Sequence, residues 1–261
     1  MRIGISTACL YPMETEKALR TVLDLGFKKL EIFINAYSEM NHNFIKSLKD
    51  IADEYGAKII SIHPFSSIFE TLLLFSNYPR RLQDGYDFYR KFAEIAQILG
   101  AKFMVLHGSR NFKLYTNEEY YERFATVSEI FNEYGIILAQ ENVYMFRGQD
   151  PEFLSSMRKY LNNNVSFVFD VKQAIRAGYD PFEVLKAMGD RVAHIHVNDN
   201  NIDIGRDCML PGKGKMDYKK LNDYLRQIDY KGEWIIEVYR QDFTNINELV
   251  ESGKFLDQYI V

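Results

Sequence analysis

The chain alternates short apolar segments with longer amphipathic ones, and this alternation repeats along its whole length. In the first amphipathic stretch Ala18, Val22 and Leu25 recur at i, i+4 and i+7, which is the spacing of one helix face. The eight apolar segments, which we expect to be strands, are Arg2–Thr7, Lys29–Ile34, Lys58–His63, Lys102–His107, Ile136–Val143, Val165–Val171, Val192–Val197 and Glu233–Val238. Eight strand-and-helix units in 261 residues match the size and period of a (β/α)₈ barrel.

The rest of the sequence favours one barrel domain over residues 1–261. The strands are apolar nearly throughout, as expected when helices cover one side of them and the barrel core covers the other. No Ser/Gly linker, low-complexity tract or shift in composition marks a second domain. A doubly wound open sheet is the alternative fold, but no G-x-G-x-x-G turn follows the first strand. We therefore predict a single-domain TIM barrel of the α/β class.

Several helix starts carry capping residues. Thr116, with Glu119 three residues later, has the pattern of a capping box. Asp150 and Asp180 each precede a proline, whose missing N–H costs nothing in the first helical turn. The connection Phe65–Asp84 is longer than the others and largely apolar. We expect it to be either a packed extra helix or a lid over the barrel mouth.

Polar residues stand where most of the strands end, and four of the five histidines are among them, His42 being the exception. In a (β/α)₈ barrel the carboxyl ends of the strands converge on the active-site mouth. A carboxylate facing the helical layer would be buried without a partner, so we expect these groups to face the mouth. They are His63, His107, Glu141, Asp170, His194, His196 and Glu237.

Carboxylates and imidazoles aimed at one small volume would repel one another unless a positive charge lay among them, and a divalent cation is the usual solution. Four of these residues, which we call the quartet, offer three oxygens and one nitrogen: Glu141, Asp170, His196 and Glu237. That mixture suits Mn²⁺, Co²⁺ or Mg²⁺, and Zn²⁺ also accepts it. His194 points the same way as His196 by the period of two, so we expect it to support the site from behind or to belong to the core.

Composition favours a small-molecule substrate. Lys and Arg total 32 against 36 Asp and Glu, a net charge of -4, whereas nucleic-acid binders usually carry a basic excess. No apolar run approaches the roughly 18 residues of a membrane helix. The first residues lack the layout of a secretory signal, and Cys9 and Cys208 are too few for a disulfide framework. We expect a cytoplasmic protein with no nucleic-acid or membrane partner and with both cysteines as apolar fillers; a homo-oligomer stays open.

At these residues the sequence resembles the xylose-isomerase-like TIM barrels. This superfamily includes sugar and sugar-phosphate isomerases and epimerases, inosose dehydratases and the endonuclease IV type of abasic-site nuclease. The resemblance spans nearly the whole chain, and its strength lies in the order of its pieces along successive strands. The pieces are His63-Pro64, Leu106-His107-Gly108, Gln140-Glu141-Asn142, Phe169–Ala174, His196–Asn200, Pro211–Gly214 with Met216–Tyr218, and Ile236-Glu237.

The ketose 3-epimerases of this superfamily hold one metal ion through Glu, Asp, His and Glu from strands five to eight, which match the quartet. The resemblance therefore implies that Glu141 and Glu237 also act as the catalytic acid and base on opposite faces of a sugar. It further implies that His63 and His107 bind substrate hydroxyls or a second metal ion.

The nuclease relatives hold three zinc ions, and here the match is incomplete. One site corresponds to His63, His107 and a bridging Glu141, and a second corresponds to the quartet. The third site lacks its ligands, because its histidine falls on Gln173 and its Asp-x-His falls on Arg206-Asp207-Cys208. The resemblance therefore disfavours a zinc-dependent phosphoesterase.

From these observations we expect a metal-dependent sugar or sugar-phosphate isomerase or epimerase that removes a proton alpha to a carbonyl and passes through an enediolate. Gln173 would bind substrate hydroxyls, while Lys172, Arg110 and Arg206 would either attract a phosphate or carboxylate or be ordinary surface cations. An endonuclease IV-like phosphoesterase, an inosose-type dehydratase and a non-catalytic carbohydrate-binding barrel stay open as alternatives.

Overall fold

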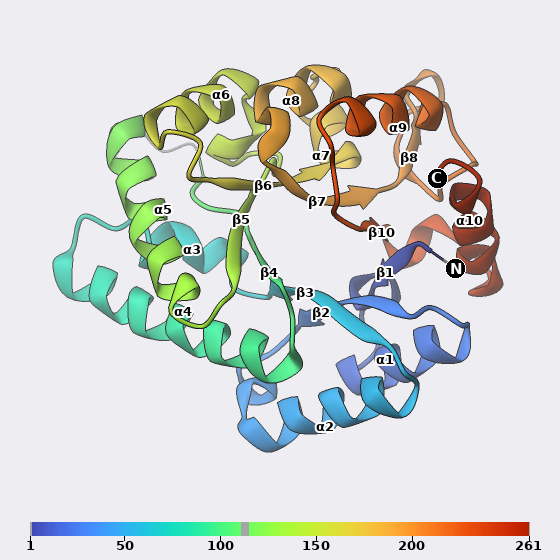
Figure 1. Ribbon diagram of the computed structural model, residues 1–261, viewed down its shortest axis with the longest axis horizontal. Helices are drawn as coiled ribbons and strands as arrows, with labels where there is room; N and C mark the ends of the chain where they lie inside the picture. The colour runs from blue at the N-terminus through green and yellow to red at the C-terminus, as the bar shows by residue number, and fades with distance from the viewer. Residues whose placement is uncertain (1, 111–114, 261) are drawn as a thin grey trace.

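The computed structural model describes residues 2–110 and 115–260, and its centre is a closed barrel of parallel strands (Figure 1). Around the barrel the strands are β1 (Gly4–Ser6), β10 (Trp234–Ile236), β7 (Val192–Val197), β6 (Ser166–Asp170), β5 (Ile137–Glu141), β4 (Phe103–Leu106), β3 (Lys58–Pro64) and β2 (Lys29–Ile34). Pairing of β2 with β1 closes the ring. The predicted (β/α)₈ barrel is confirmed, and each expected segment corresponds to one barrel strand.

The helices lie outside this ring (Figure 1). In the described residues they are α1 (Thr15–Asp24), α2 (His42–Glu54), α3 (Ser67–Leu73), α4 (Pro79–Leu99), α5 (Asn117–Asn132), α6 (Pro151–Tyr160), α7 (Val171–Arg176), α8 (Pro181–Met188), α9 (Tyr218–Gln227) and α10 (Asn247–Asp257). The capping box of Thr116 and Glu119 is confirmed, and Asp150 and Asp180 cap α6 and α8. None of these helices combines the length and apolar character needed to span a membrane.

The long connection after β3 contains an extra helix, α3, which was one of the two expectations. The burial pattern of α3 is the reverse of that in an ordinary amphipathic helix, where apolar side chains are buried and charged ones are exposed. The carboxylate residue Glu70 is fully buried, while three large apolar side chains, Ile68, Phe69 and Leu72, are exposed. This helix is therefore anchored by a polar side chain.

A short antiparallel hairpin after β7 was not predicted. It consists of β8 (Asp199–Asn201) and β9 (Arg206–Met209). Its strands are short and mostly polar, so they lack the apolar alternation from which the barrel strands were recognised.

Inward-facing side chains form two layers near the carboxyl end of the barrel. The residues at the strand ends form what we call the mouth layer: His63, His107, Glu141, Asp170, His196 and Glu237. Side chains two positions earlier on a strand point the same way, and they form what we call the inner layer. This layer is fully buried and consists of Ser61, Val105, Ala139, Val168 and His194, together with Glu31, which lies two positions before Phe33 on β2. Half of it is an apolar cluster of Val105, Ala139 and Val168, and the other half is polar.

Candidate functional site

The quartet converges around one nitrogen atom of the mouth layer. Nδ1 of His196 lies 3.0 Å from Oε1 of Glu141 and 3.4 Å from Oε2 of Glu237. Oδ2 of Asp170 lies 3.6 Å from the same nitrogen. One donor atom from each of the four residues lies within 4.8 Å of the other three. The structure therefore brings together all four side chains that the sequence singled out as metal ligands.

Hydrogen bonds fix which oxygen of Asp170 faces the other quartet members. The side chain of Asn142 accepts the Asp170 backbone N–H at 2.8 Å and donates to its carbonyl oxygen at 2.9 Å. Oδ1 of Asp170 accepts hydrogen bonds from the Asn198 amide, at 3.1 Å, and from the Gln173 backbone N–H at the start of α7. Because Oδ1 is occupied by these donors, Oδ2 is the oxygen that faces His196.

The other two imidazoles of the mouth layer face Glu141. Nε2 of His107 lies 3.0 Å from Oε2 of Glu141, and Nε2 of His63 lies 3.8 Å from the same oxygen. The two imidazoles are 2.9 Å apart through their Nε2 atoms, and Phe33 stacks on the His63 ring. These three residues form a second group of candidate ligands, and the group shares Glu141 with the quartet.

A further carboxylate, Glu31 of the inner layer, lies beneath the quartet and was missed by the sequence analysis. Its Oε2 lies 3.0 Å from Nε2 of His196 and 3.1 Å from Nε2 of His194, and it accepts a hydrogen bond from Ser61. A carboxylate can only accept, so His196 keeps a proton on Nε2, and whenever the imidazole is neutral the lone pair of Nδ1 faces the quartet. The signal in the sequence was an acidic residue inside the apolar segment Lys29–Ile34.

These partners keep buried groups charged. Burial alone would raise the pKa of Glu141, but the imidazoles around it hold that pKa well below its usual range. Burial also acts to raise the pKa of Asp170, but the ammonium of Lys172 and the imidazole of His196 together lower that pKa. For His196, burial would lower the pKa, but Glu31 and the quartet carboxylates raise it well above its usual value. The site is therefore a cluster of alternating charges that already balances its carboxylates with cations.

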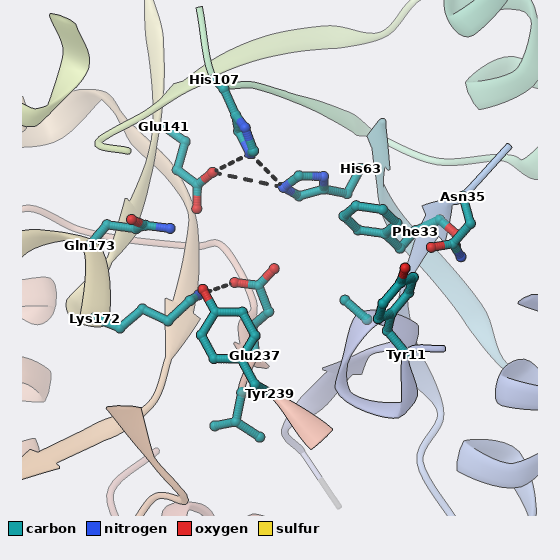
Figure 2. A pocket seen from close by; sticks show the side chains of 12 residues that line it. Tyr11, Phe33, Asn35, His63, His107, Glu141, Lys172, Gln173, Glu237 and Tyr239 are labelled. Carbon is teal, nitrogen blue, oxygen red and sulfur yellow. Dashed lines mark hydrogen bonds and ion pairs between the residues drawn. The ribbon is translucent and has the colours of Figure 1, made fainter. Parts of the chain in front are cut away.

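A cavity of about 290 Å³ opens beside the quartet (Figure 2). It is lined by Ala8, Tyr11, Phe33, Asn35, His63, His107, Glu141, Lys172, Gln173, Glu237, Val238 and Tyr239. Glu141 and Glu237 thus reach the cavity, whereas Asp170 and His196 are 0% exposed and lie behind them. Two members of the quartet therefore line the cavity, and the other two lie behind them.

Two of the four residues expected to bind substrate line this cavity. The ammonium of Lys172 is buried and contacts the carboxylates of Asp170 and Glu237. Gln173 accepts the backbone N–H of Tyr144 through Oε1, at 3.1 Å. Gln173 therefore offers the NH₂ group of its side chain to the cavity, whereas the ammonium of Lys172 is already paired with two carboxylates.

The other two, Arg110 and Arg206, are not among the lining residues. Arg206 is exposed on β9 and lies 3.3 Å from Asp242. The guanidinium of Arg110 packs over the ring of Phe146, 5.9 Å from its centroid. The structure therefore does not bring these two cations into the cavity, because each is held by a partner outside it.

Glu70 of α3 is a second buried carboxylate that the sequence analysis missed. It accepts hydrogen bonds from the Tyr89 hydroxyl, at 2.9 Å, and from the Gly108 backbone N–H next to His107. Burial raises the pKa of Glu70 to about 7, against the lowering effect of His107 and these donors. In the sequence it stood within a largely apolar connection, which gave no sign that it ties α3 to the end of β4.

The donor set of the quartet fits a divalent cation. Three carboxylate oxygens and one imidazole nitrogen suit Mn²⁺, Co²⁺ or Zn²⁺. Within the described residues, no candidate ligand group includes Asp207 or Cys208, and Asp207 is paired with Arg176 instead. Both cysteines are buried, and burial raises the pKa of Cys9 to about 12, which fits a filler better than a ligand.

Comparison with known protein families and sequences gives matches over nearly the whole chain. The model of the xylose isomerase-like TIM-barrel family matches residues 19–259. Uncharacterized proteins of Methanocaldococcus jannaschii and Mycobacterium leprae are 26% and 22% identical over 100% of this chain, and over 89% and 98% of their own lengths. An inosose dehydratase of Geobacillus kaustophilus is 31% identical over 96 residues, which is 31% of each chain.

Solved structures share the same fold. A D-tagatose 3-epimerase-like protein superimposes with a TM-score of 0.78 at 24% identity, covering 99% of this chain and 97% of its own. A D-psicose 3-epimerase from Clostridium cellulolyticum H10, solved with D-tagatose, gives 0.79 at 16% identity over 99% of both chains. The IOLI protein with a bound zinc atom gives 0.79 at 17% identity, over 100% of this chain and 99% of its own.

Proposed function

The chain belongs to the xylose isomerase-like TIM-barrel family, and from this premise we propose that it is a divalent-metal-dependent isomerase or epimerase of a small sugar or sugar phosphate. The division of the quartet carries the proposal: Glu141 and Glu237 line the cavity, whereas Asp170 and His196 lie behind them. The two inner residues would only hold the metal ion. The two glutamates would hold it and also reach the substrate, as a proton-transferring group must.

In the proposed reaction the quartet's divalent ion would polarise the carbonyl of a ketose and stabilise charge that develops as the alpha proton leaves. One of Glu141 and Glu237 accepts that proton, and the other donates a proton on the opposite face. Both carboxylates line the same cavity, so the same pair serves either direction of the reaction.

Other lining residues would bind and orient the sugar. His63 and His107 offer imidazole nitrogens to hydroxyl groups, and Gln173 offers its amide N–H groups. Phe33, Tyr11 and Tyr239 supply aromatic walls that would cover the apolar faces of a sugar ring and exclude water (Figure 2). A cavity of about 290 Å³ suits a monosaccharide-sized molecule.

A dehydratase of the same fold is the second candidate, favoured by the match to the Geobacillus kaustophilus inosose dehydratase. Such an enzyme also begins by removing a proton beside a carbonyl. Its product is one water lighter than the substrate, whereas an isomerase or epimerase leaves the mass unchanged. The mass of the product therefore separates the two.

The test is a substrate panel. Purified protein is stripped with a chelator, reloaded with Mn²⁺, Co²⁺, Mg²⁺ or Zn²⁺, and incubated with ketoses and ketose phosphates, with products identified by chromatography and mass. We expect metal-dependent formation of an epimer or isomer of at least one compound. Failure of every metal-loaded sample to convert any member would contradict the proposal.

A further inference from the structure

Lys172 is a buried cation that contacts two carboxylates of the quartet. It stands in the first turn of α7, two residues after Asp170, and only 2% of its surface is exposed. Its ammonium contacts Oδ2 of Asp170 and Oε2 of Glu237, and it lies 5.8 Å from the centre of the Tyr239 ring. Figure 2 shows the side chain extending toward Glu237 along the cavity wall. A lysine almost never reaches this burial unless carboxylates pair with it.

The oxygens that hold this ammonium are the ones that would hold a metal ion. Oδ2 of Asp170 and Oε2 of Glu237 are the oxygens with which these two residues face Nδ1 of His196, at 3.6 and 3.4 Å. Oδ1 of Asp170 cannot replace Oδ2, because it accepts hydrogen bonds from Asn198 and from the start of α7. A divalent ion on these oxygens would lie close to the ammonium and repel it strongly in a buried site.

A nearby cation gives the contrast. Arg176 lies one helical turn later on α7, and its guanidinium packs over the same Tyr239 ring, 4.9 Å from the centroid. It forms hydrogen bonds with Asp207 and with the Tyr239 hydroxyl, and among the described residues it has no contact with a quartet oxygen. Two cations of one short helix thus share an aromatic ring, but only Lys172 is paired with quartet carboxylates.

We propose that Lys172 is a resident cation that holds Asp170 and Glu237 in place when the quartet carries no metal, and that a divalent ion displaces it from them. This inference rests on the metal site of the proposed function. Binding of the ion must break both ammonium contacts, so Lys172 weakens the apparent metal affinity. Once displaced, the ammonium lies at the wall of the cavity that Lys172 lines, where it can contact oxygens of the substrate.

Metal titration of Lys172→Met tests the competition, with Arg176→Met as the matched control. Chelator-stripped proteins are titrated with Mn²⁺ alone, and the dissociation constant is measured by calorimetry. We expect Lys172→Met to bind Mn²⁺ about tenfold more tightly than the wild type, a typical coupling between two sites. Arg176→Met should bind it as the wild type does. Metal-free Lys172→Met should unfold at a lower temperature than the wild type, and saturating Mn²⁺ should remove that difference.

Every result of this titration either supports or overturns the proposed competition between Lys172 and the metal ion. Equal or weaker Mn²⁺ binding by Lys172→Met overturns the competition and leaves the metal site intact. If neither the wild type nor Lys172→Met binds any ion of the Mn²⁺, Co²⁺ and Zn²⁺ series, the metal site fails and this inference fails with it. Binding by the variant alone supports the competition in its strongest form. If Lys172→Met does not fold without metal, Lys172→Gln takes its place, because glutamine can form hydrogen bonds but carries no charge. Lys172→Gln must then also bind Mn²⁺ more tightly than the wild type.

Discussion

The mouth layer and the inner layer lie two residues apart on β3, β4, β5, β6 and β7, yet they differ in composition. Glu237, after β10, belongs to the mouth layer alone, and Glu31, on β2, belongs to the inner layer alone. Every residue of the mouth layer is polar, whereas the inner layer is apolar beneath the ends of β4, β5 and β6 and polar beneath β2, β3 and β7. Glu141 and Asp170 therefore stand above Ala139 and Val168, while His196 stands above His194 and beside Glu31. Only the imidazole ligand has a buried carboxylate behind it.

The difference follows from what each ligand needs in order to point correctly. A carboxylate has two equivalent oxygens, and for Asp170 the hydrogen bonds of Asn198 and α7 decide which of them faces inward. An imidazole offers its metal-binding lone pair only in one tautomer, and a hydrogen bond to the other ring nitrogen selects that tautomer. In the proposed function, the chemistry therefore belongs to the mouth layer and the orientation of His196 to the inner layer.

The largest effect is expected in the mouth layer, from Glu141→Gln and Glu237→Gln. An amide in place of either carboxylate loses both a charged ligand and a proton-transferring group, and the proton transfer alone is worth roughly 10²–10⁴-fold in rate. Turnover should be abolished in each variant while the circular dichroism spectrum stays that of the folded wild type. Near-normal activity in either variant would show that the paired-glutamate mechanism is wrong.

The control is a glutamate on the same strand but outside both layers. Glu233 lies just before β10, at the opposite end of the barrel strand, and is paired with Lys29 at 2.5 Å. Glu233→Gln should leave turnover close to that of the wild type, because this ion pair is partly exposed and far along the strand from the cavity. A comparable loss in this variant would mean that the effect of Glu237→Gln is not specific to the mouth layer.

A smaller effect is expected in the inner layer, from Glu31→Gln. The change removes the carboxylate that fixes His196, and loss of such a supporting partner typically costs about 10–100-fold in metal affinity. Competition with a chromophoric chelator measures this affinity without any substrate. Ser61→Ala removes another hydrogen bond to Glu31 but leaves the contact with His196, so it should bind metal nearly as the wild type does. Equal affinities for Glu31→Gln and the wild type would remove the distinction between the layers.

The second ligand group offers a test within the mouth layer itself. His63, His107 and Glu141 should hold a further, weaker zinc ion at high zinc concentration. Zinc titration should therefore show two ions per wild-type chain and one per chain of His107→Asn. His42→Asn, a change at an exposed histidine on α2, should keep both. A wild-type stoichiometry of one at saturating zinc would restrict metal binding to the quartet.

The smallest effect is expected from Gln173→His, at the cavity wall outside both layers. Gln173 lines the cavity but is not a member of the quartet, so the metal site should be unaffected. The change replaces an amide with an imidazole at the cavity wall. We expect relative kcat/KM values for different ketoses to shift by several fold while activity persists, since one hydroxyl contact is worth about 1 kcal/mol. Complete loss of activity would show that Gln173 is required for catalysis and does not only bind substrate.

The sequence predicted the mouth layer better than the inner layer, for a physical reason. A polar residue that ends an apolar strand interrupts a visible pattern, and the barrel geometry then says where it points; all six mouth-layer residues were recognised in this way. Glu31 and Ser61 lie inside strands, where the sequence alone does not show whether a single polar side chain points into the barrel or toward its surface. Recognising them requires the register of β2 against β3, which places Glu31 opposite Ser61.

Other features depended on long-range contacts that no local pattern encodes. Glu70 is buried because the Gly108 N–H and the Tyr89 hydroxyl reach it from other elements. Lys172 was expected near the mouth, but its pairing with Glu237 joins residues 65 positions apart. The hairpin of β8 and β9 has too few residues to show a period. For Arg206, on that hairpin, the sequence left open a contact with substrate and an ordinary surface position, and the structure pairs it with Asp242.

Solvent deuterium reports directly on proton abstraction by the mouth layer. The metal-loaded protein is incubated in D₂O with a ketose that it converts, and the recovered sugar is examined by NMR. We expect deuterium at the carbon beside the carbonyl, in substrate and product, only when metal is present and in neither Glu141→Gln nor Glu237→Gln. Conversion of the sugar with no deuterium at that carbon would contradict proton transfer through the two glutamates.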